Sequence, residues 1–598
     1  VTFVGDERRV HPRLEASKPL QVRDDDRPIT RLAHTQNDSE KIIAVPVDFN
    51  RVHLIFIEER RTLMGGKKVS ITRKDMVPPV QGKITTLVID ERGDSLFIGT
   101  TSGQILRGNL SAEPVAFETL AATSNADIAV TMLGFLLGDR TLIVGDSSGG
   151  VTSWLLLRDE NNNLKLRKNH IFLPHDRPVK FFSASQRHKG FLTGDDSGVV
   201  RIHFGTTGET QMTLQQDLSS SILKGAYFSP KSDGMLSVDA SGKIYNWAVD
   251  NPHPETTIKS LFSKTWYEGY AEPEYVWQST GGTDDFEPKF SLVPLIFGTL
   301  KGTFYALLFA GPLALLGAFY HSQFMHPKIR AWVKPFIEIM AALPSVVLGF
   351  LAGLWLAPVL EKVLPGFIFF PFVVVLFVLV AVIVWDLSPL GLRKICKEGY
   401  EIFGFILIVL AGVTVAFYLS GKFESAFLQG DYRLWLNSVL GVSYDQRNAV
   451  VVGLAMGFAV IPMIFTISED ALSNVPKHLT ASSLALGATP WQTALYVVLP
   501  TASPGIFSAL MIGFGRAVGE TMIVLMATGN TPVMEWNIFN GFRALSANIA
   551  VELPEAPEGG TLFRVLFLAA FLLFLMTFTV NTLAEWIRLR LRERYQTL

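Results

Sequence analysis

Two charged residues stand inside an apolar stretch of the chain, in the string GIFSALMIGFGRAVGETMIVLM. Arg516 and Glu520 are four residues apart, a spacing that puts both side chains on one face of a helix. A charge within a bilayer is costly unless it meets a partner or a watery pathway. Gly515 and Gly519 form a small-xxx-small pattern that lets another helix approach closely. The spacing therefore indicates an intramembrane functional site, with a purely structural ion pair as the alternative.

The sequence shows no motif for a disulfide, a metal site, a nucleotide-binding loop or nucleic-acid binding. The chain has a single cysteine, Cys396, which excludes an internal disulfide and a thiolate metal cluster. The histidines show no ligand spacing such as HExxH, and neither GxxxxGKS nor GxxxxGKT occurs. The net charge of −1 accompanies no basic stripe, which speaks against a nucleic-acid partner. We expect no catalytic residue, no metal and no cofactor in this chain.

The helix expected to hold Arg516 and Glu520 belongs to an apolar second half of the chain. Of the 598 residues, 48% are hydrophobic, which is too many for a wholly soluble protein. The long apolar runs begin near Val293, and the first 285 residues hold none. The shift predicts a membrane domain over 293–598. Seven candidate spans lie at 293–320, 335–359, 367–385, 402–418, 449–467, 504–526 and 563–586.

Basic residues concentrate in alternate connections between these spans. By the positive-inside rule, those connections and the C-terminal tail are cytoplasmic. Seven crossings then put the residues before Val293 outside the cytoplasmic membrane, so we expect an upstream transmembrane helix that precedes this chain. The basic residues on the cytoplasmic side are Lys328, Arg330, Lys334, Arg393, Lys394, Lys397, Lys477, Arg588, Arg590, Arg592 and Arg594, against Lys362, Lys422, Arg433, Arg447, Arg543 and Arg564 on the other side.

The first 250 residues carry a degenerate repeat. Four segments, LFIGTTSGQI, LIVGDSSGGV, FLTGDDSGVV and LSVDASGKI, alternate apolar residues up to a Ser-Gly turn. Their turn glycines, Gly103, Gly149, Gly198 and Gly242, are 46, 49 and 44 residues apart, about the length of a four-stranded propeller blade. Glycine suits such turns because it adopts positive φ at little cost. We predict an all-β, WD40-like propeller domain over 1–250, incomplete at its N-terminus, that serves as a docking platform or is merely structural.

A connector over 251–292 joins the two predicted domains. It carries four prolines together with Trp266, Tyr270 and Trp277. Aromatic residues of this kind gather at membrane–water interfaces. We therefore expect an irregular linker that lies partly at such an interface.

The loop SEDALSNVPKHLTASSLALGATPWQTALYVVLP, residues 468–500, is the most specific segment of the chain. Pro476 stands where a helix can start and Gly487 where it can stop, and Thr489-Pro490 supplies an N-cap and a first-turn proline for the next helix. The loop resembles the EAA loop of bacterial ABC importer permeases. Nine residues separate Gly487 from an aliphatic-x-Leu-Pro ending, as in that family, and Ala481-Ser482-Ser483 replaces the EAA triplet.

This resemblance implies how the loop would work. In the family, the loop forms a coupling helix that inserts into a cleft on an ATP-binding-cassette ATPase, here over 472–487. The ATPase would be a dimer of separate chains, and the present chain would be non-catalytic. The coupling residues that the resemblance implies are Leu472, Pro476, Ala481, Ser482, Ser483, Gly487, Leu499 and Pro500.

The string GRAVGET with the following GNTP resembles the phosphate-specific permeases of the PstC type. That resemblance implies that Arg516 contacts phosphate in transit while Glu520 holds the arginine, with Thr521 beside them. A guanidinium offers forked donors to phosphate oxygens. The run IEIMAALPSVVLG matches the same family, and it adds Glu338 and Ser345 to the implied pathway.

The resemblance covers residues 290–598 and implies a mixed fold: an external all-β propeller-like domain, then an all-α polytopic permease domain in a bacterial inner membrane. The hairpin over 367–418 is an insertion relative to the family. Implied partners are the lipid bilayer, the ATPase dimer, a homologous second permease of the PstA type and a periplasmic phosphate-binding protein. A permease for another oxyanion, such as sulfate or molybdate, and a membrane receptor that senses ligand through the propeller are the alternatives.

Overall fold

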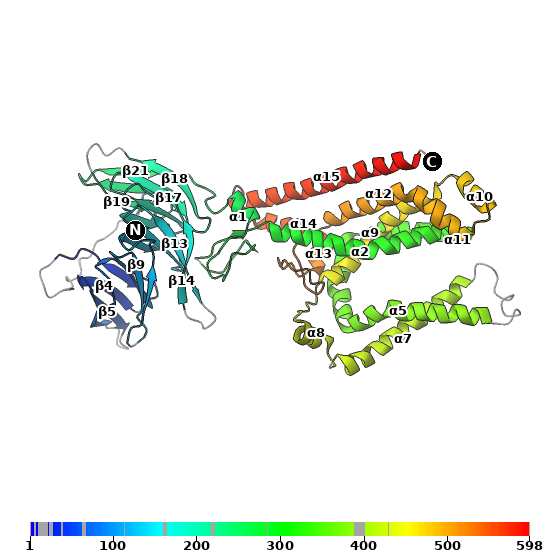
Figure 1. Ribbon diagram of the computed structural model, residues 1–598, viewed down its shortest axis with the longest axis horizontal. Helices are drawn as coiled ribbons and strands as arrows, with labels where there is room; N and C mark the ends of the chain where they lie inside the picture. The colour runs from blue at the N-terminus through cyan, green and yellow to red at the C-terminus, as the bar shows by residue number, and fades with distance from the viewer. Residues whose placement is uncertain are drawn as a thin grey trace. The chain divides into compact units, whose positions relative to one another are not determined.

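The computed structural model describes residues 2–4, 7–9, 22, 28–37, 40–61, 67–112, 114–158, 164–216, 222–283, 285–387, 401–428 and 430–596. The chain divides into two compact units (Figure 1). The first contains residues 1–259 with 264–274 and 280–288, and the second contains 260–263, 275–279 and 289–598. Each unit has its own cores.

Among the described residues, the first unit contains five antiparallel sheets of three or four strands that follow one another in chain order, and each is a simple meander. This arrangement is propeller-like, as the repeat predicts. The strands are β3 (Ala33–Gln36), β4 (Glu40–Asp48), β5 (Arg51–Arg61), β6 (Lys67–Met76), β7 (Ile84–Ile89), β8 (Ser95–Thr100), β9 (Gln104–Asn109), β10 (Phe117–Ala121), β11 (Val130–Phe135), β12 (Thr141–Asp146), β13 (Val151–Arg158), β14 (Leu164–Ile171), β15 (Phe181–Ala184), β16 (Gly190–Gly194), β17 (Val199–Phe204), β18 (Glu209–Gln215), β19 (Leu223–Phe228), β20 (Gly234–Asp239) and β21 (Ile244–Ala248), with a small sheet of β1 (Thr2–Val4) and β2 (Glu7–Arg9).

The cores of this unit lie between consecutive sheets. One cluster joins Leu54 of β5 to Leu96 of β8, another joins Phe97 of β8 to Leu142 of β12, and a third joins Ile143 of β12 to Phe191 of β16. Strands β8 and β16 are buried along their whole length, because a sheet between two others has no face toward water. Each repeat therefore needs a neighbouring repeat to cover the apolar faces of its sheet.

The repeated turns have the geometry that their residues predict. All four turn glycines have positive φ, between 71° at Gly103 and 95° at Gly198. An aspartate closes three of these turns: Asp146, Asp195 and Asp239 each accept backbone N–H groups from residues two and four positions later.

The connector is mostly irregular and divides between the two units. Residues 264–274 and 280–288 belong to the first unit, where Glu268 pairs with the buried Lys189 at 2.6 Å. In the second unit, β22 (Trp277–Gln278) pairs with β23 (Lys289–Phe290) beside α1 (Ile258–Phe262). Trp277 is only 3% exposed, and its Nε1–H donates to Glu552. The aromatic residue is thus buried within protein.

The second unit is helical (Figure 1). Its helices are α2 (Val293–Gln323), α3 (Pro327–Ala341), α4 (Ser345–Leu351), α5 (Ala357–Leu387), α7 (Glu401–Phe427), α8 (Tyr432–Leu440), α9 (Ala449–Ser473), α10 (Lys477–Ala485), α11 (Pro490–Thr493), α12 (Leu499–Val518), α13 (Met522–Ala527), α14 (Leu545–Glu552) and α15 (Thr561–Gln596), with π-helical turns η1 (Ala352–Leu356) and η2 (Ala494–Val498) and a 3-10 turn η3 (Leu553–Glu555).

Within the described residues, six helical segments are long and apolar enough to cross a membrane, not the predicted seven. The predicted spans 335–359 and 367–385 have wrong boundaries: Pro344 separates α3 from α4, and α4, η1 and α5 then run on together. Proline lacks an N–H group and disfavours helical backbone in the residue before it. The helix therefore breaks in the middle of a predicted span.

Helix α3 is a further segment that is not among these six spans. Lys334 of α3 contacts the end of α9, which leads into the loop before α12. Gly349 of α4 lies against Met522 and Ile523, just beyond the other end of α12. The pair α3–α4 thus connects the two ends of the bundle. The hairpin that the sequence analysis predicts as an insertion contains α5 packed on α7; residues 388–400 between them lie outside the described residues, as does Cys396.

Candidate translocation and coupling site

The predicted coupling loop forms two short helices with the expected ends. Helix α10 begins after Pro476 and ends before Gly487, whose φ is +90°. Thr489 caps α11: its hydroxyl accepts from the N–H of Gln492, while the Gln492 side chain accepts from the N–H of Thr489. The turn glycine and the capping box therefore specify the hairpin locally, as the sequence predicts.

The aliphatic-x-Leu-Pro ending lies where the hairpin enters the bundle. The π-helical turn η2 precedes Pro500, and the N–H of Leu499 donates to the carbonyl of Ala494, five residues back. Proline has no N–H group to donate to a helical carbonyl, and its ring clashes with the preceding turn, a clash that a π-helical turn relieves. The motif thus joins α11 to α12 as one helical path.

Helix α10 contributes no buried residue to this chain. Leu486 is 90% exposed and Leu484 is 47% exposed. Ala481 and Ser482 are exposed as well, while the Ser483 hydroxyl lies 2.9 Å from that of Thr493 and holds the two helices together. The face of the hairpin that carries the family's triplet is therefore open.

The base of the hairpin, in contrast, is anchored in the bundle. Leu472 and Val475 are buried. The Trp491 ring packs at 5.9 Å from Phe319 and 5.8 Å from Phe324 at the end of α2. A displacement of the exposed helix would thus reach α2 and α9 directly.

Arg516 and Glu520 do not lie on one continuous helix, contrary to the prediction. Helix α12 ends at Val518, with Gly519 as its C-cap, and α13 begins at Met522. Glu520 faces the start of α13, where its carboxylate accepts from the N–H of Ile523 at 3.4 Å. Arg516 is exposed, and within the described chain it forms no ion pair with Glu520 or another acid. The break leaves the guanidinium open.

The other predicted pathway residues reach this break to different degrees. Thr521 occupies the N-cap position of α13, and its hydroxyl donates to the Gly519 carbonyl at 3.3 Å. Ser345 is the first residue of α4, whose Gly349 lies against α13 so closely that an added Cβ would be 2.8 Å from the Met522 carbonyl oxygen. Glu338 is exposed on α3. The structure therefore places Thr521 at the break, brings the helix of Ser345 to it, and leaves Glu338 on a separate helix.

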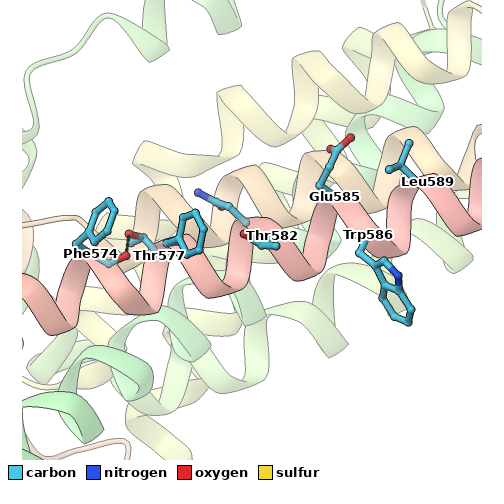
Figure 2. A pocket seen from close by; sticks show the side chains of 8 residues that line it. Phe574, Thr577, Thr582, Glu585, Trp586 and Leu589 are labelled. Atoms are coloured by element: carbon cyan, nitrogen blue, oxygen red, sulfur yellow. Dashed lines mark hydrogen bonds between the residues drawn. The ribbon is translucent and has the colours of Figure 1, made fainter.

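One face of α15 bears an open and mostly apolar pocket, with a row of polar residues along it, that the sequence reasoning missed. It has a volume of about 600 Å³, and its lining includes Thr577, Asn581, Glu585 and Trp586 (Figure 2). A Cβ added at Gly515 of α12 would lie 3.1 Å from the Asn581 Oδ1. Polar residues four positions apart in an apolar helix were the available signal.

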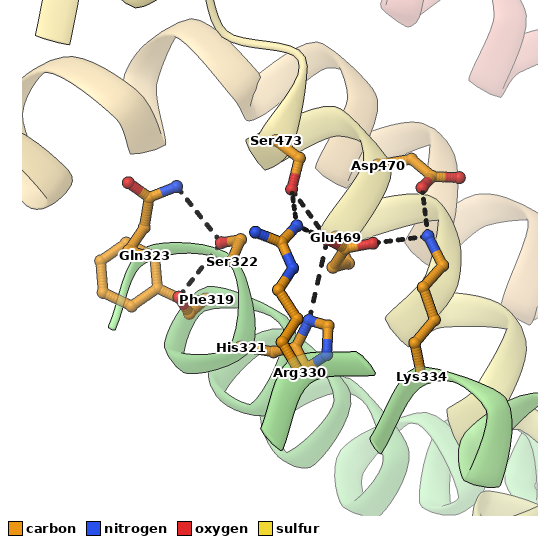
Figure 3. A network of polar contacts seen from close by, with 9 residues as sticks. All are labelled: Phe319, His321, Ser322, Gln323, Arg330, Lys334, Glu469, Asp470 and Ser473. Carbon is orange, nitrogen blue, oxygen red and sulfur yellow. Dashed lines mark hydrogen bonds and ion pairs between the residues drawn. The ribbon is translucent and has the colours of Figure 1, made fainter. Parts of the chain in front are cut away.

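A second charged group was missed as well. Glu469 of α9 is 1% exposed and meets Arg330 and Lys334 of α3 (Figure 3). The sequence reasoning counts both cations only as signs of a cytoplasmic loop. The string Ser-Glu-Asp at the end of an apolar span was the available signal, because a carboxylate there needs a cation.

Comparisons with known proteins agree with this geometry. Residues 310–595 match the family "Binding-protein-dependent transport system inner membrane component". The chain is 24% identical over 322 residues to "Probable ABC transporter permease protein YqgH" of Bacillus subtilis, covering 54% of this chain and 79% of that protein. It is 26% identical over 308 residues to "Phosphate transport system permease protein PstC" of Xylella fastidiosa, covering 52% and 76%.

A shorter likeness reaches a second kind of permease. "Phosphate transport system permease protein PstA 1" of Mycobacterium tuberculosis is 35% identical over 158 residues, covering 26% of this chain and 50% of that protein. Among solved structures, the β-propeller domain of Swd1 from Myceliophteria thermophila is similar with a TM-score of 0.28 at 16% identity, covering 36% of this chain and 67% of that one. At so low a score, the propeller-like description rests on the sheet order alone.

The family match covers α3 to α15, the coupling hairpin and the break after α12. The six apolar spans agree with a multi-pass protein of the inner membrane. The second unit of this chain is a PstC-type permease domain of an ABC transporter.

Proposed function

We propose that this chain is the permease subunit of an ATP-driven importer that moves inorganic phosphate across the cytoplasmic membrane. The observation that carries the proposal is the exposed guanidinium of Arg516 at the end of α12, which has no acidic partner among the described residues. A cation on a helix of a membrane bundle needs a partner. An anion in transit supplies one.

The chemistry of the break suits a passing oxyanion. A guanidinium gives two parallel N–H donors to phosphate oxygens. Glu520 lies just beyond the helix end and is tied to the backbone of Ile523. Its negative charge weakens anion binding, so phosphate would leave as well as enter. The relatives named as phosphate transport permeases support phosphate over other oxyanions.

The partners follow from what the chain leaves open. We propose that α10, with Leu486 fully exposed at its end, docks on a separate ATPase dimer. The open face of α12 would meet a homologous second permease, so that the pathway runs between two chains. A periplasmic phosphate-binding protein would deliver the substrate, as the family's description as binding-protein-dependent suggests.

We also propose an orientation for the two units. Basic residues cluster at the ends of helices next to the coupling hairpin, including Lys328 and Arg588. That end would be cytoplasmic. Counting α3 as a crossing beside the six apolar spans gives seven. Val293 would then lie on the periplasmic side, and the propeller-like unit with it, where it would act as a docking platform.

The test is uptake of radiolabelled phosphate by cells whose only copy of this subunit is wild type, Arg516→Gln or Arg588→Gln. Arg588 is a matched control because it is an exposed arginine that already pairs with Glu585. We expect Arg516→Gln to lower phosphate uptake at least tenfold, about 1.4 kcal/mol in the barrier, at equal membrane abundance. Arg588→Gln should keep it.

The other outcomes separate the alternatives. Normal phosphate uptake with Arg516→Gln would contradict the role of the arginine. Uptake of sulfate or molybdate instead of phosphate by the wild type would keep the permease and replace the substrate. No uptake of any oxyanion, together with a signalling protein on the cytoplasmic face, would favour a receptor.

A further inference from the structure

A buried carboxylate fixes α3 to the base of the coupling hairpin. Glu469 lies four residues before the end of α9 and is 1% exposed. Its Oε2 is 2.9 Å from the Nζ of Lys334, and its Oε1 accepts from Arg330. Ser473, the last residue of α9, donates to the same Oε1 at 2.8 Å. We call Glu469, Arg330, Lys334 and Ser473 the clamp (Figure 3).

Further groups complete the electrostatic surroundings of the clamp. Arg330 also donates to the Ser473 hydroxyl at 2.7 Å, so it contacts α9 at two points. The buried His321 of α2 places its Nδ1 3.7 Å from the Glu469 carboxylate. Asp470, which is 55% exposed at its side chain, makes one contact, with Lys334 at 3.0 Å. The carboxylate of Glu469 is thus the shared centre, and that of Asp470 is peripheral.

The two sides of the clamp lead to different functional parts. On the α9 side, only three residues separate Ser473 from the first residue of α10. On the α3 side, the chain continues through Pro344 into α4, whose Gly349 lies against Met522 and Ile523. Those two residues follow the break after α12, the helix that carries Arg516.

Resting on the proposed function, we infer that Glu469 is a positioning residue for energy coupling: the clamp makes α3 move together with the coupling hairpin. A motion that an ATPase imposes on α10 then reaches α13 through α3 and α4. Without the clamp, α10 would still dock, but α3 would no longer follow it. ATP hydrolysis would continue while transport per ATP would fall.

Such a role requires a rigid connection, and the arrangement provides one. A charge-assisted hydrogen bond is about twice as strong as a neutral one, and burial of the carboxylate protects its bonds from competing water. Arg330 adds a planar fork that fixes orientation as well as distance. Two cations spaced four residues apart on α3 therefore resist both sliding and rotation of that helix against α9.

The experiment measures the separation of α3 from α10 in the full chain with its ATPase, with and without a non-hydrolysable ATP analogue. Spin labels go on Trp332→Cys of α3, which is 82% exposed, and on Lys477→Cys of α10, with Cys396→Ser as background. In the wild type, we expect a single narrow distribution of the distance between the two labels, with the same mean with and without the nucleotide. Glu469→Gln should broaden it and make it depend on nucleotide, whereas Asp470→Asn should behave as the wild type.

A functional measurement accompanies the distances. In proteoliposomes, Glu469→Gln should lower phosphate uptake per ATP hydrolysed at least fivefold, the lower range of ordinary coupling between sites, with hydrolysis itself retained. Asp470→Asn should leave that ratio unchanged. If Glu469→Gln accumulates poorly, Arg330→Gln, Lys334→Gln and Glu469→Gln are combined, which removes every charge of the clamp; Asp470 then loses Lys334, but its side chain is 55% exposed.

Several results would overturn the inference. They are a nucleotide-dependent distance in the wild type, an unchanged distribution and ratio in Glu469→Gln, or an equal loss in Asp470→Asn. The distance measurement does not depend on the substrate. A wild-type complex that transports no phosphate would therefore contradict the proposed function, while the distances would still test the clamp.

Discussion

Two charged groups in the membrane domain solve the same physical problem in opposite ways. Glu469 is 1% exposed and is surrounded by Arg330, Lys334 and Ser473. Arg516 is exposed and, within the described chain, has no acidic partner. Both residues stand in helices that are long and apolar enough to cross a membrane, where an unsatisfied charge is costly.

The difference shows how a charge can be assigned a role. A carboxylate that its own chain satisfies completely has no capacity left for a ligand, so it can only fix helices in place. A cation that the chain leaves open can bind something that arrives. On this reasoning, loss of Glu469 should affect stability and coupling, whereas loss of Arg516 should affect transport alone.

The largest effect expected from this comparison is on stability. Removing one partner of a buried ion pair usually costs about 3–5 kcal/mol. We expect Glu469→Ala to cost about 3 kcal/mol, the low end of that range, because Arg330 and Lys334 are each 37% exposed and can turn to water. Arg516→Ala should change stability by less than about 0.5 kcal/mol, as surface substitutions do.

The measurement is thermal unfolding of the membrane domain within the full chain in detergent. A loss of 3 kcal/mol should lower the midpoint by roughly 6 °C or more in Glu469→Ala. If Arg516→Ala lowered it equally, the arginine would be a structural partner after all, and the distinction between the two sites would disappear.

A buried network in the propeller-like unit allows the same comparison without a membrane. His203 is fully buried, with its Nε2 2.8 Å from the Thr193 hydroxyl and its Nδ1 2.9 Å from that of Thr210. His175 joins the same Thr193 hydroxyl to Asp195. Burial lowers the pKa of His203 to about 3. His203 is therefore neutral at pH 7, unlike the charged groups of the clamp.

The sign of the resulting pH dependence is fixed. An unfolded histidine takes up a proton below about pH 6.5, whereas folded His203 stays neutral down to about pH 3. Stability is therefore complete above pH 6.5 and is lost as the pH falls, by about 1.4 kcal/mol per pH unit. Between pH 6.5 and 5 the loss is about 2 kcal/mol.

Comparison with His203→Gln isolates this contribution from others. Burial raises the pKa of Asp139 to about 6, and that carboxyl contributes a pH dependence of the opposite sign below pH 6. The contribution of Asp139 is the same in the wild type and in His203→Gln, so it cancels when their pH profiles are compared. Hydrogen exchange of the β16 and β17 amides in the full chain, corrected for intrinsic rates, should show a flatter pH profile in His203→Gln. Parallel profiles would mean that His203 is protonated in the folded state.

The sequence predicted those features that neighbouring residues decide. The positive φ of Gly103, Gly149 and Gly198 and the capping box at Thr489 were all confirmed, because each depends on contacts within a few positions. The propeller-like meander followed from the same turns. The permease family was also identified from a local motif, the spacing from Gly487 to Leu499-Pro500.

The features that the sequence missed depend on distant contacts. Arg330 and Glu469 are 139 residues apart, and nothing local pairs them. The helix break after Gly519 is supported by Ser546, whose hydroxyl donates to the Glu520 carbonyl at 2.9 Å from 26 residues away. A glycine within an apolar run is compatible with a continuous helix. Only packing by α14 and α4 decides that the helix ends there.

The smallest expected effect concerns the hairpin itself, with no charge involved. Gly487 has φ +90°, and no atom lies within 4 Å of the position that a Cβ would occupy. An alanine would therefore meet no clash and would suffer only the backbone cost of left-handed φ, about 1–2 kcal/mol. We expect Gly487→Ala to speed amide exchange over 477–489 about fivefold or more, the opening that 1 kcal/mol allows.

The control for this change is Gly487→Asn, because asparagine tolerates left-handed backbone better than alanine. The amide-exchange rate of Gly487→Asn should lie between those of the wild type and Gly487→Ala, although the asparagine side chain is larger than that of alanine. Equal exchange in the two variants would mean that the turn does not need glycine's backbone freedom. If the order holds while the distance from Trp332 to Lys477 in Gly487→Ala remains narrow, the hairpin turn and the clamp act separately. The clamp would then connect α3 to the end of α9, and the turn would only shape the surface that an ATPase meets.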